Sequence, residues 1–268
     1  MKVFVVSLAR AEARIKYITA HLESLNLDYE LIDAVDYQQL TPKDFERLTN
    51  TEAIQQNQWL TKGVIACSLS HVKVYKHIVE NDVGICLVIE DDAVLPQDIK
   101  KTLAIIEGEI SRGEIISLSY FNHHQAKNST DLSMQHIKQI SNNLQLVYPV
   151  DLHDIASAMA YVITKEVAAN MLKVSMPIAN AADHWGDHRG KGGFDSFRCV
   201  YPPQVRAALL RSAIDYAHSK TLMSKIAGWI REYNVPVLST FLNRRTEKLQ
   251  TEKYHFSFID EPPFNEPR

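Results

Sequence analysis

The chain of 268 residues is poor in cysteine. Its three cysteines, Cys67, Cys86 and Cys199, are odd in number and show no C-x-x-C spacing. They lie in apolar segments such as 85–89, where a cysteine behaves as a small buried hydrophobe. We therefore expect reduced core thiols in a cytoplasmic protein, because disulfides persist mainly in oxidising compartments.

The sequence also lacks long hydrophobic runs. The apolar run within residues 1–7 is much shorter than the core of a signal peptide, and it has no small-residue cleavage site. Elsewhere the uncharged apolar stretches fall well below the roughly 20 residues that a membrane-spanning helix needs. We expect no export by this route and only peripheral contact with a membrane.

An excess of positive charge is missing as well. Lys and Arg total 29 against 32 for Asp and Glu, which gives a formal net charge of −3. Without a basic field, a dedicated DNA or RNA binder is not expected, so the sequence predicts no nucleic-acid partner. The hydrophobic content of 46% is enough to build a sizeable core in one large or two small domains. Disorder and fibrous repeats are therefore excluded.

Short apolar runs alternate with segments of helical hydrophobic spacing. The pattern predicts strands at residues 3–8, 29–33, 84–89, 114–119, 144–147 and 158–164. It predicts helices around residues 15–25, 69–79, 98–107 and 165–173, with a polar insert at 41–58. Such alternation is typical of an α/β protein with a Rossmann-like, mostly parallel sheet and helices on both faces.

The composition changes after about residue 219, so we divide the chain into a domain at 1–218 and a basic appendage at 219–268. In the appendage, basic residues alternate with apolar ones such as Trp229 and Phe241. One interpretation is peripheral binding to an anionic membrane surface. The other is a C-terminal helix packed on the core. We expect Asp260–Pro263 to be a frayed tail.

Three adjacent carboxylates, Glu90, Asp91 and Asp92, follow the apolar strand predicted at 84–89. Ligands of open α/β sheets bind beyond the carboxyl ends of the strands. Alternation along an extended strand end points Glu90 and Asp92 to the same side, where a hard cation such as Mg²⁺ or Mn²⁺ would offset their repulsion. The alternative is an acidic turn that caps the next helix.

A second candidate is Ser7-Leu8-Ala9-Arg10 with Arg14, at the predicted turn from the first strand into the first helix. Such a turn offers free backbone N–H groups, and arginine offers a planar fork, which together suit a phosphate or a nucleotide base. Two arginines four residues apart are also what an ordinary solvated helix face presents.

The segment 61–71 places Ser68 and Ser70 close to His71, as in some nucleophilic enzymes. Adjacent residues on a helix diverge by about 100°, however, so a shared proton is disfavoured. A histidine satisfied near the start of a helix is the simpler interpretation.

The segment 182–193 is polar and rich in glycine. His184 and His188 have the i, i+4 spacing of zinc proteases, but Gly186 and the glycines that follow argue against a continuous helix. As a loop, the segment would bind a sugar by stacking on Trp185, with Asp183 or Asp187 taking a hydroxyl proton. The alternative is a solvated connection with Trp185 in the core.

Several motifs occur in a particular order along the chain. They are Val5–Arg10 with Arg14, Asp33-Ala34, Lys62-Gly63 leading to Cys67 and Ser70-His71, and Val88–Asp92. Together they resemble glycosyltransferase family 25, which includes bacterial lipooligosaccharide galactosyltransferases and collagen galactosyltransferase domains. The ordered motifs cover about residues 1–95, and a weaker similarity continues through 157–163 and Asp183.

The resemblance implies a GT-A fold, an inverting mechanism and a UDP-sugar donor held through Mn²⁺ or Mg²⁺. By position, Glu90 and Asp92 match the metal motif of the family. The residues placed with the donor are Ser7, Leu8, Arg10, Arg14, Asp33, Lys62, Gly63, Ser70, His71 and Asp91. This sequence departs from the family pattern at three places. The family often has Asn at the position of Ser7 and Glu at the position of Val64. Residues 157–160 stand where the family has a segment that contains glycine.

The function expected on this basis is transfer of a hexose, most simply by a β-galactosyltransferase, from UDP-galactose to a sugar of lipooligosaccharide or lipopolysaccharide. A metal on the acidic motif would stabilise the leaving pyrophosphate, and a separate carboxylate would deprotonate the acceptor. Asp183 is the first candidate for that base, with Asp187 and Asp154 as competitors, and Trp185 is expected to bind the acceptor. The alternatives are a metal-dependent phosphoester hydrolase, whose second cluster would use His184, Asp187 and His188, and a non-catalytic sugar-nucleotide-binding protein.

Overall fold

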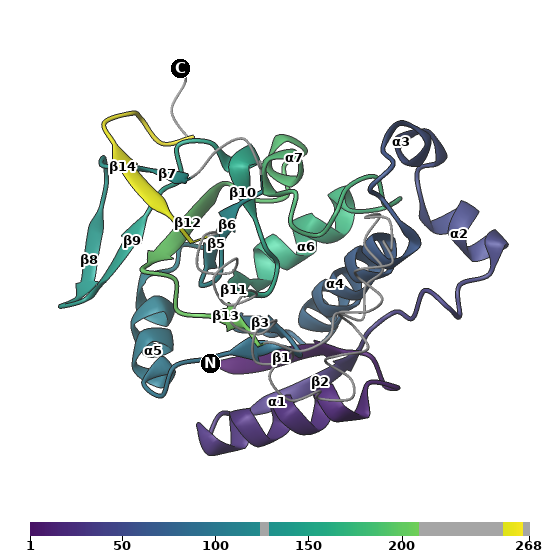
Figure 1. The fold of residues 1–268 in the computed structure, drawn as a ribbon, viewed down its shortest axis with the longest axis horizontal. Helices are drawn as coiled ribbons and strands as arrows, with labels where there is room; N and C mark the ends of the chain where they lie inside the picture. Colours follow the sequence, from purple (N-terminus) through teal and green to yellow (C-terminus); the bar gives the residue numbers. More distant parts are fainter. Residues whose placement is uncertain (124–128, 209–253, 265–268) are drawn as a thin grey trace, which may run out of the picture.

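A computed structural model describes residues 1–123, 129–208 and 254–264. Its centre is an eight-stranded sheet with the strand order β2-β1-β3-β11-β5-β12-β9-β8 (Figure 1). In that order the strands are Tyr29–Asp33, Lys2–Ser7, Ile85–Glu90, Ala160–Thr164, Glu114–Ser117, Ser196–Tyr201, Leu144–Val147 and Lys138–Ser141.

The sheet is mixed, with most strands pointing in one direction. Strands β2, β1 and β3 are mutually parallel, and β12 is parallel to β5. Strands β11 and β9 run against their neighbours. The α/β class and the mostly parallel sheet are therefore confirmed. The hydrophobic pattern did not reveal the reversal at β11, because a strand buried on both faces has the same apolar composition in either direction.

Helices cover both faces of the sheet, as predicted. Alternate residues of β1 belong to different core clusters. Val3 and Val5 pack with helices α1 (Glu12–Ser24) and α5 (Ile99–Glu109), while Phe4 and Val6 pack with α4 (Lys62–Glu80) and α6 (Lys165–Val174). This period of two is the signature of a strand between two layers of helix.

The polar insert contains two short helices, α2 (Pro42–Leu48) and α3 (Thr51–Gln56). Thr41 and Asp44 form a capping box at the start of α2. Thr61 caps α4 by accepting a hydrogen bond from the Val64 N–H. The insert therefore leads directly into α4, whose first turn lies at the carboxyl end of β1.

Smaller elements complete the fold. Helix α7 spans Trp185–Gly190, and a 3-10 turn spans Leu152–Asp154. Three two-stranded sheets pair β10 (Ile155–Ala156) with β6 (Phe121–Asn122), β13 (Arg206–Ala207) with β4 (Ala93–Val94), and β14 (Phe256–Ile259) with β7 (Thr130–Ser133).

The described end of the chain packs on the sheet domain. Strand β14 pairs in parallel with β7, the Ser133 Oγ donates a hydrogen bond to the carbonyl of Glu261 (2.6 Å), and Pro263 is buried. The expectation of a frayed tail at Asp260–Pro263 is therefore wrong. The boundary at 218/219 and the basic residues after it, up to residue 253, lie outside the described residues.

All three cysteines are free thiols; Cys86 and Cys199 are buried, and Cys67 is partly exposed. In the part of the chain that the structure describes, no helix combines the length and the apolar character needed to cross a membrane.

Candidate active site

Strands β1, β2 and β3 bring their carboxyl ends to one edge of the sheet. Because the three strands are parallel, Ser7 lies in register with Asp33 on one side, and Val6 lies in register with Glu90 on the other. Two sequence motifs that are about 80 residues apart thus meet where α/β proteins commonly place a ligand.

An open pocket of about 530 Å³ lies at this edge. It is lined by residues from β1 and α1, from the segment after β2, from one face of α4 and from the end of β3: Val6, Ser7, Leu8, Arg14, Ala34, Val35, Tyr37, Gly63, Ala66, Cys67, Ser70, Glu90 and Asp91. The α4 residues are all small, so this face of the helix leaves space for a ligand.

Asp91 ties the strand ends together. One carboxylate oxygen accepts a hydrogen bond from the Ser7 Oγ (2.7 Å), and the other pairs with Arg14 (3.0 Å). Burial raises the pKa of Asp91, and the Arg14 guanidinium opposes that rise. Both oxygens are engaged, so this carboxylate holds β1, α1 and β3 in place at the rim of the pocket.

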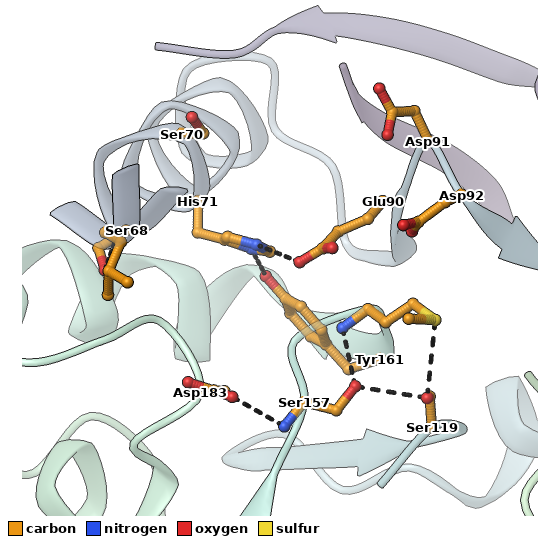
Figure 2. A network of polar contacts seen from close by, with 12 residues as sticks. Ser68, Ser70, His71, Glu90, Asp91, Asp92, Ser119, Ser157, Tyr161 and Asp183 are labelled. Carbon is orange, nitrogen blue, oxygen red and sulfur yellow. Dashed lines mark hydrogen bonds and ion pairs between the residues drawn. The ribbon is translucent and has the colours of Figure 1, made fainter. Parts of the chain in front are cut away.

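Glu90 and Asp92 point to the same side of the chain, while Asp91 points away (Figure 2). One Asp92 oxygen pairs with Arg14, and the other, Oδ1, is buried without a hydrogen-bond partner. Burial, followed by the charge of Glu90, raises the pKa of Asp92 to about 7. Asp92 also leads into β4, and the N-cap position of the next helix is Asp98, so the interpretation of the acidic motif as a helix-capping turn is wrong.

The donor set at this point fits a hard divalent cation. Glu90 and Asp92 supply carboxylate oxygens, one of which is buried and unpartnered. Crowded carboxylates of this kind are the ligands that Mg²⁺ and Mn²⁺ prefer.

His71 lies between the pocket and the core. Its Nδ1 lies 2.8 Å from the hydroxyl of Tyr161, and its Nε2 is buried, unpartnered and 3.7 Å from a Glu90 oxygen (Figure 2). The Cys67 Sγ joins them, because the ligand atoms of Cys67, His71 and Glu90 all lie within 4.8 Å of one another. We missed Cys67 in this role, although its i, i+4 spacing to His71 on one helix was a usable signal.

The neighbouring serines are engaged elsewhere. Ser70 Oγ donates to the Ala66 carbonyl (2.7 Å) and accepts from the Val35 N–H (2.8 Å). Ser68 Oγ is within hydrogen-bond distance of the carbonyls of Val64 (3.1 Å) and Asn180 (3.2 Å). Ser70 therefore shapes the pocket by fixing the segment after β2, and Ser68 fixes α4 against the segment before α7.

Besides His71, three predicted donor residues lie outside the pocket lining. Arg10 forms a two-bond pair with Asp36 (2.5 and 3.3 Å), which lowers the pKa of that carboxyl. Asp33 accepts a hydrogen bond from the Ala9 N–H (3.2 Å), and Lys62 lies over the Phe45 ring. Arg10 and Asp33 thus shape the turn between β1 and α1, while Lys62 lies on the insert side of α4.

Asp183 is linked to the acidic motif through the segment before β11. Its Oδ2 accepts a hydrogen bond from the Ser157 N–H (3.0 Å), and Ser157 has a left-handed φ of 100°. Two residues on, the Met159 carbonyl accepts from the Glu90 N–H (2.9 Å). Figure 2 shows Asp183 and Glu90 on either side of the Tyr161 side chain. The structure therefore brings together two carboxylates that are far apart in sequence.

The other two candidate bases have different surroundings. Asp187 lies on α7, with its side chain 43% exposed, and pairs with the Nδ1 of His184 (3.1 Å). Asp154 lies in the 3-10 turn and is buried. Its backbone carbonyl accepts a hydrogen bond from the His123 N–H (3.4 Å).

Trp185 does not present a face to a ligand. It is fully buried, and its indole Nε1 donates to the Ser157 carbonyl (3.3 Å). The expectation that Trp185 binds the acceptor is therefore wrong, and the alternative of a core residue holds. The predicted loop is also helix α7 from residue 185 on. A Cβ at Gly186 would lie 2.4 Å from the exposed His153 ring, so a larger residue there would require that ring to move.

His188 is part of the core. Its Nε2 lies 3.0 Å from the Ala181 carbonyl, and only 4% of the residue is exposed. The zinc arrangement with His184 is therefore wrong, although the helix forms. Burial is the main cause that lowers the pKa of His188 to about 4.

This buried histidine predicts acid sensitivity. Above pH 6.5 the His188 imidazole is neutral in both the folded and the unfolded state, so its protonation does not lower the stability of the fold. Between pH 6.5 and 4 the imidazole of the unfolded chain takes up a proton that the folded protein excludes, and this favours unfolding. We expect a loss of about 3 kcal/mol of unfolding free energy across this window from His188. Urea unfolding of wild type and of His188→Gln at pH 6.5 and at pH 4 measures this loss of unfolding free energy. Equal pH dependence in the two proteins would contradict the assignment.

Comparison with known proteins identifies similar sequences. The family model "Glycosyltransferase family 25 (LPS biosynthesis protein)" matches residues 1–185. A "Putative glycosyltransferase" of Haemophilus influenzae is 30% identical over 104 residues, which is 38% of this chain and 36% of that protein. Human procollagen galactosyltransferase 2 is 27% identical over 119 residues, 42% of this chain and 19% of that protein.

The mouse protein "Inactive glycosyltransferase 25 family member 3" is also similar, with 27% identity over 107 residues, 38% of this chain and 18% of that protein. The chain thus matches only about a fifth of the length of the mammalian relatives. Among solved structures, apo UDP-glucose pyrophosphorylase superposes with a TM-score of 0.42 and 10% identity, covering 78% of this chain and 92% of that one.

Proposed function

The chain belongs to glycosyltransferase family 25, and from this premise we propose that it transfers a hexose from a UDP-sugar to the hydroxyl of an acceptor sugar. Galactose is the favoured sugar, because relatives named as galactosyltransferases match this chain. A glycolipid oligosaccharide, as in lipooligosaccharide or lipopolysaccharide, is the favoured acceptor because the family description names LPS biosynthesis. The proposal includes a GT-A type of catalytic domain and inversion at the anomeric carbon.

One observation carries the proposal. The pocket at the carboxyl edge of β1 and β3 ends at the acidic motif, where Glu90 and Asp92 share one side and an Asp92 oxygen is buried and unpartnered. A nucleotide with a charged diphosphate has complementary chemistry, since its base would occupy the apolar part of the pocket and its diphosphate the acidic end through a cation.

Residues of the chain then have distinct tasks. Leu8, Val35 and Tyr37 bound the part of the pocket suited to the base. Arg14 holds Asp91 and Asp92 in position, and Glu90 and Asp92 would hold Mn²⁺ or Mg²⁺. When bound, that ion supplies Lewis-acid stabilisation of the leaving diphosphate.

Asp183 is assigned the proton transfer. It takes the proton of the acceptor hydroxyl while the hydroxyl oxygen forms a bond to the anomeric carbon and the bond from that carbon to the UDP oxygen breaks. Its link to Ser157 fixes the side chain in orientation, because an N–H hydrogen bond holds one of its two oxygens. The other oxygen is left for the acceptor.

The phosphoester hydrolase receives less support. Its second metal cluster would need His184, Asp187 and His188, and His188 is committed to the Ala181 carbonyl inside the core. Among the described residues, the group with metal-ligand geometry is Cys67, His71 and Glu90, on the opposite side of Tyr161 from Asp183. A non-catalytic role is the second candidate, because an inactive family member is among the similar proteins.

A release assay separates the three functions. Purified protein with UDP-galactose, UDP-glucose or UDP-N-acetylglucosamine and Mn²⁺ is incubated with and without methyl glycosides, and UDP and inorganic phosphate are measured. We expect UDP release that one donor supports best and that the acceptor stimulates. Phosphate release alone would support the hydrolase, and no release with retained UDP binding would support the non-catalytic protein.

The proposed contact with the inner face of the bacterial inner membrane depends on the basic segment, and residues 219–253 lie outside the described structure. Flotation with anionic liposomes at low and high salt tests that contact, with salt-sensitive binding as the expected result.

A further inference from the structure

Trp59 is the exposed aromatic side chain next to the candidate base. It is 44% exposed, and it is the one aromatic among the large hydrophobic side chains that stand clearly exposed in the described part of the chain. Its ring centre lies 4.6 Å from that of His184, the residue that follows Asp183. An exposed indole presents a flat apolar face that a ligand ring can cover.

The backbone that follows Trp59 is fixed. The Thr61 N–H donates to the Trp59 carbonyl (2.8 Å), Leu60 is buried, and Thr61 caps helix α4. Trp59 therefore precedes directly the helix whose first turns line the pocket. The same helix is joined to the segment that leads to Asp183, because the Ser68 Oγ donates a hydrogen bond to the Asn180 carbonyl.

Trp59 and His184 thus join the pocket-lining helix to the segment of the candidate base. The His184 ring is itself stacked on His123, with ring centres 6.3 Å apart and an interplanar angle of 15°. His184 Nδ1 is paired with Asp187, so this ring is held in orientation. The result is a rigid aromatic surface beside Asp183, while Gly63, Ala66 and Cys67 in the first turns of α4 line the donor pocket.

We propose that Trp59, supported by His184, forms the acceptor subsite and stacks on the apolar C–H face of a pyranoside. The ligand class is a β-linked hexoside or N-acetylhexosaminide, because an equatorial β-linkage together with mainly equatorial hydroxyls leaves a face of C–H groups flat enough for an indole. Stacking removes apolar surface of both partners from water, and a pre-oriented ring loses little entropy in doing so. The inference rests on the proposed glycosyl transfer and gives to Trp59 the role that the buried Trp185 cannot perform.

The test compares the acceptor and donor kinetics of Trp59 variants. With the preferred UDP-sugar, Mn²⁺ and methyl β-glycosides of galactose, glucose and N-acetylglucosamine, we expect Trp59→Ala to raise the acceptor KM about tenfold. The donor KM and the UDP release without acceptor should stay within about twofold of wild type, because the pocket is untouched. Trp59→Phe should recover most of the acceptor affinity.

Met134→Ala is the matched control, since Met134 is 55% exposed and directly follows β7, which Figure 1 shows on the other side of the molecule from α3 and α4. A spectroscopic measurement does not depend on the alanine variant. Methyl β-glycosides should change the tryptophan emission of wild type in the presence of UDP, and that change should be absent in Trp59→Phe.

An unchanged acceptor KM in Trp59→Ala, or a donor KM that rises in step with it, would overturn the acceptor subsite while leaving the transferase intact. If wild type instead transfers no sugar to any glycoside and releases no UDP, both the subsite and the proposed function fail.

Discussion

Asp92→Asn is expected to lower sugar transfer by about 10³-fold or more, because it removes a charged ligand at the point where the leaving diphosphate must be stabilised. The Mn²⁺-dependent affinity for UDP should fall by at least about tenfold in the same variant. Glu90→Gln should cost less, since Asp92 carries the buried, unpartnered oxygen. Steady-state transfer and calorimetric titration of UDP with and without Mn²⁺ measure the two effects.

The matched control is Asp98→Asn, the same chemical change six positions along. Asp98 is exposed and makes no side-chain hydrogen bond at the start of α5. Its transfer rate should equal that of wild type. Thermal unfolding of both variants distinguishes a lost ligand from a lost fold. Near wild-type activity of Asp92→Asn in the presence of a chelator would contradict a metal-dependent transfer with Asp92 as a ligand.

Asp183→Asn is expected to lower turnover by roughly 10² to 10⁴ while UDP affinity stays nearly unchanged, because a general base contacts the proton of the acceptor and not the donor. The substitution is conservative for the fold. An asparagine oxygen can still accept the hydrogen bond from the Ser157 N–H that fixes the left-handed backbone there.

The comparison variants are Asp187→Asn and Asp154→Asn, assayed side by side with it. Asp187 is paired with His184, so its loss should affect the acceptor KM more than turnover. Asp154 is buried in the 3-10 turn, so its loss should appear first as reduced stability. If Asp183→Asn lowers turnover by less than about tenfold, or lowers UDP affinity in parallel with turnover, Asp183 is not the general base. The base would then be the residue whose Asn variant loses turnover but keeps its UDP affinity.

The hydrophobic pattern predicted the layers of this fold well, because the central strands are continuous apolar runs between helices. Residues 84–89 and 29–33 were recognised as strands in this way, and β3 and β2 occupy almost the same positions. Among the eight central strands, the pattern missed β12 and β8. Arg198 interrupts the apolar run of β12, and its charge is satisfied there by Glu114 of β5, a partner that the local sequence does not show.

The candidate site was predictable where it depends on strand order and not where it depends on side-chain burial. Parallel strands bring Ser7 and Glu90 to one edge whatever the details of packing. The two tryptophans show the limit. Each follows a polar residue in the sequence, yet Trp185 is fully buried in the main core cluster and Trp59 is exposed, a difference set by tertiary packing.

The measurement that tests the central claim most directly is an anomalous diffraction map, at the manganese edge, of crystals grown with UDP and Mn²⁺. The account predicts one manganese peak within bonding distance of an Asp92 oxygen, shared with the UDP diphosphate and beside Glu90. It also predicts the uracil ring in the pocket bounded by Leu8, Val35 and Tyr37. A peak held by Cys67 and His71 without Asp92, or UDP bound away from this edge of the sheet, would contradict it.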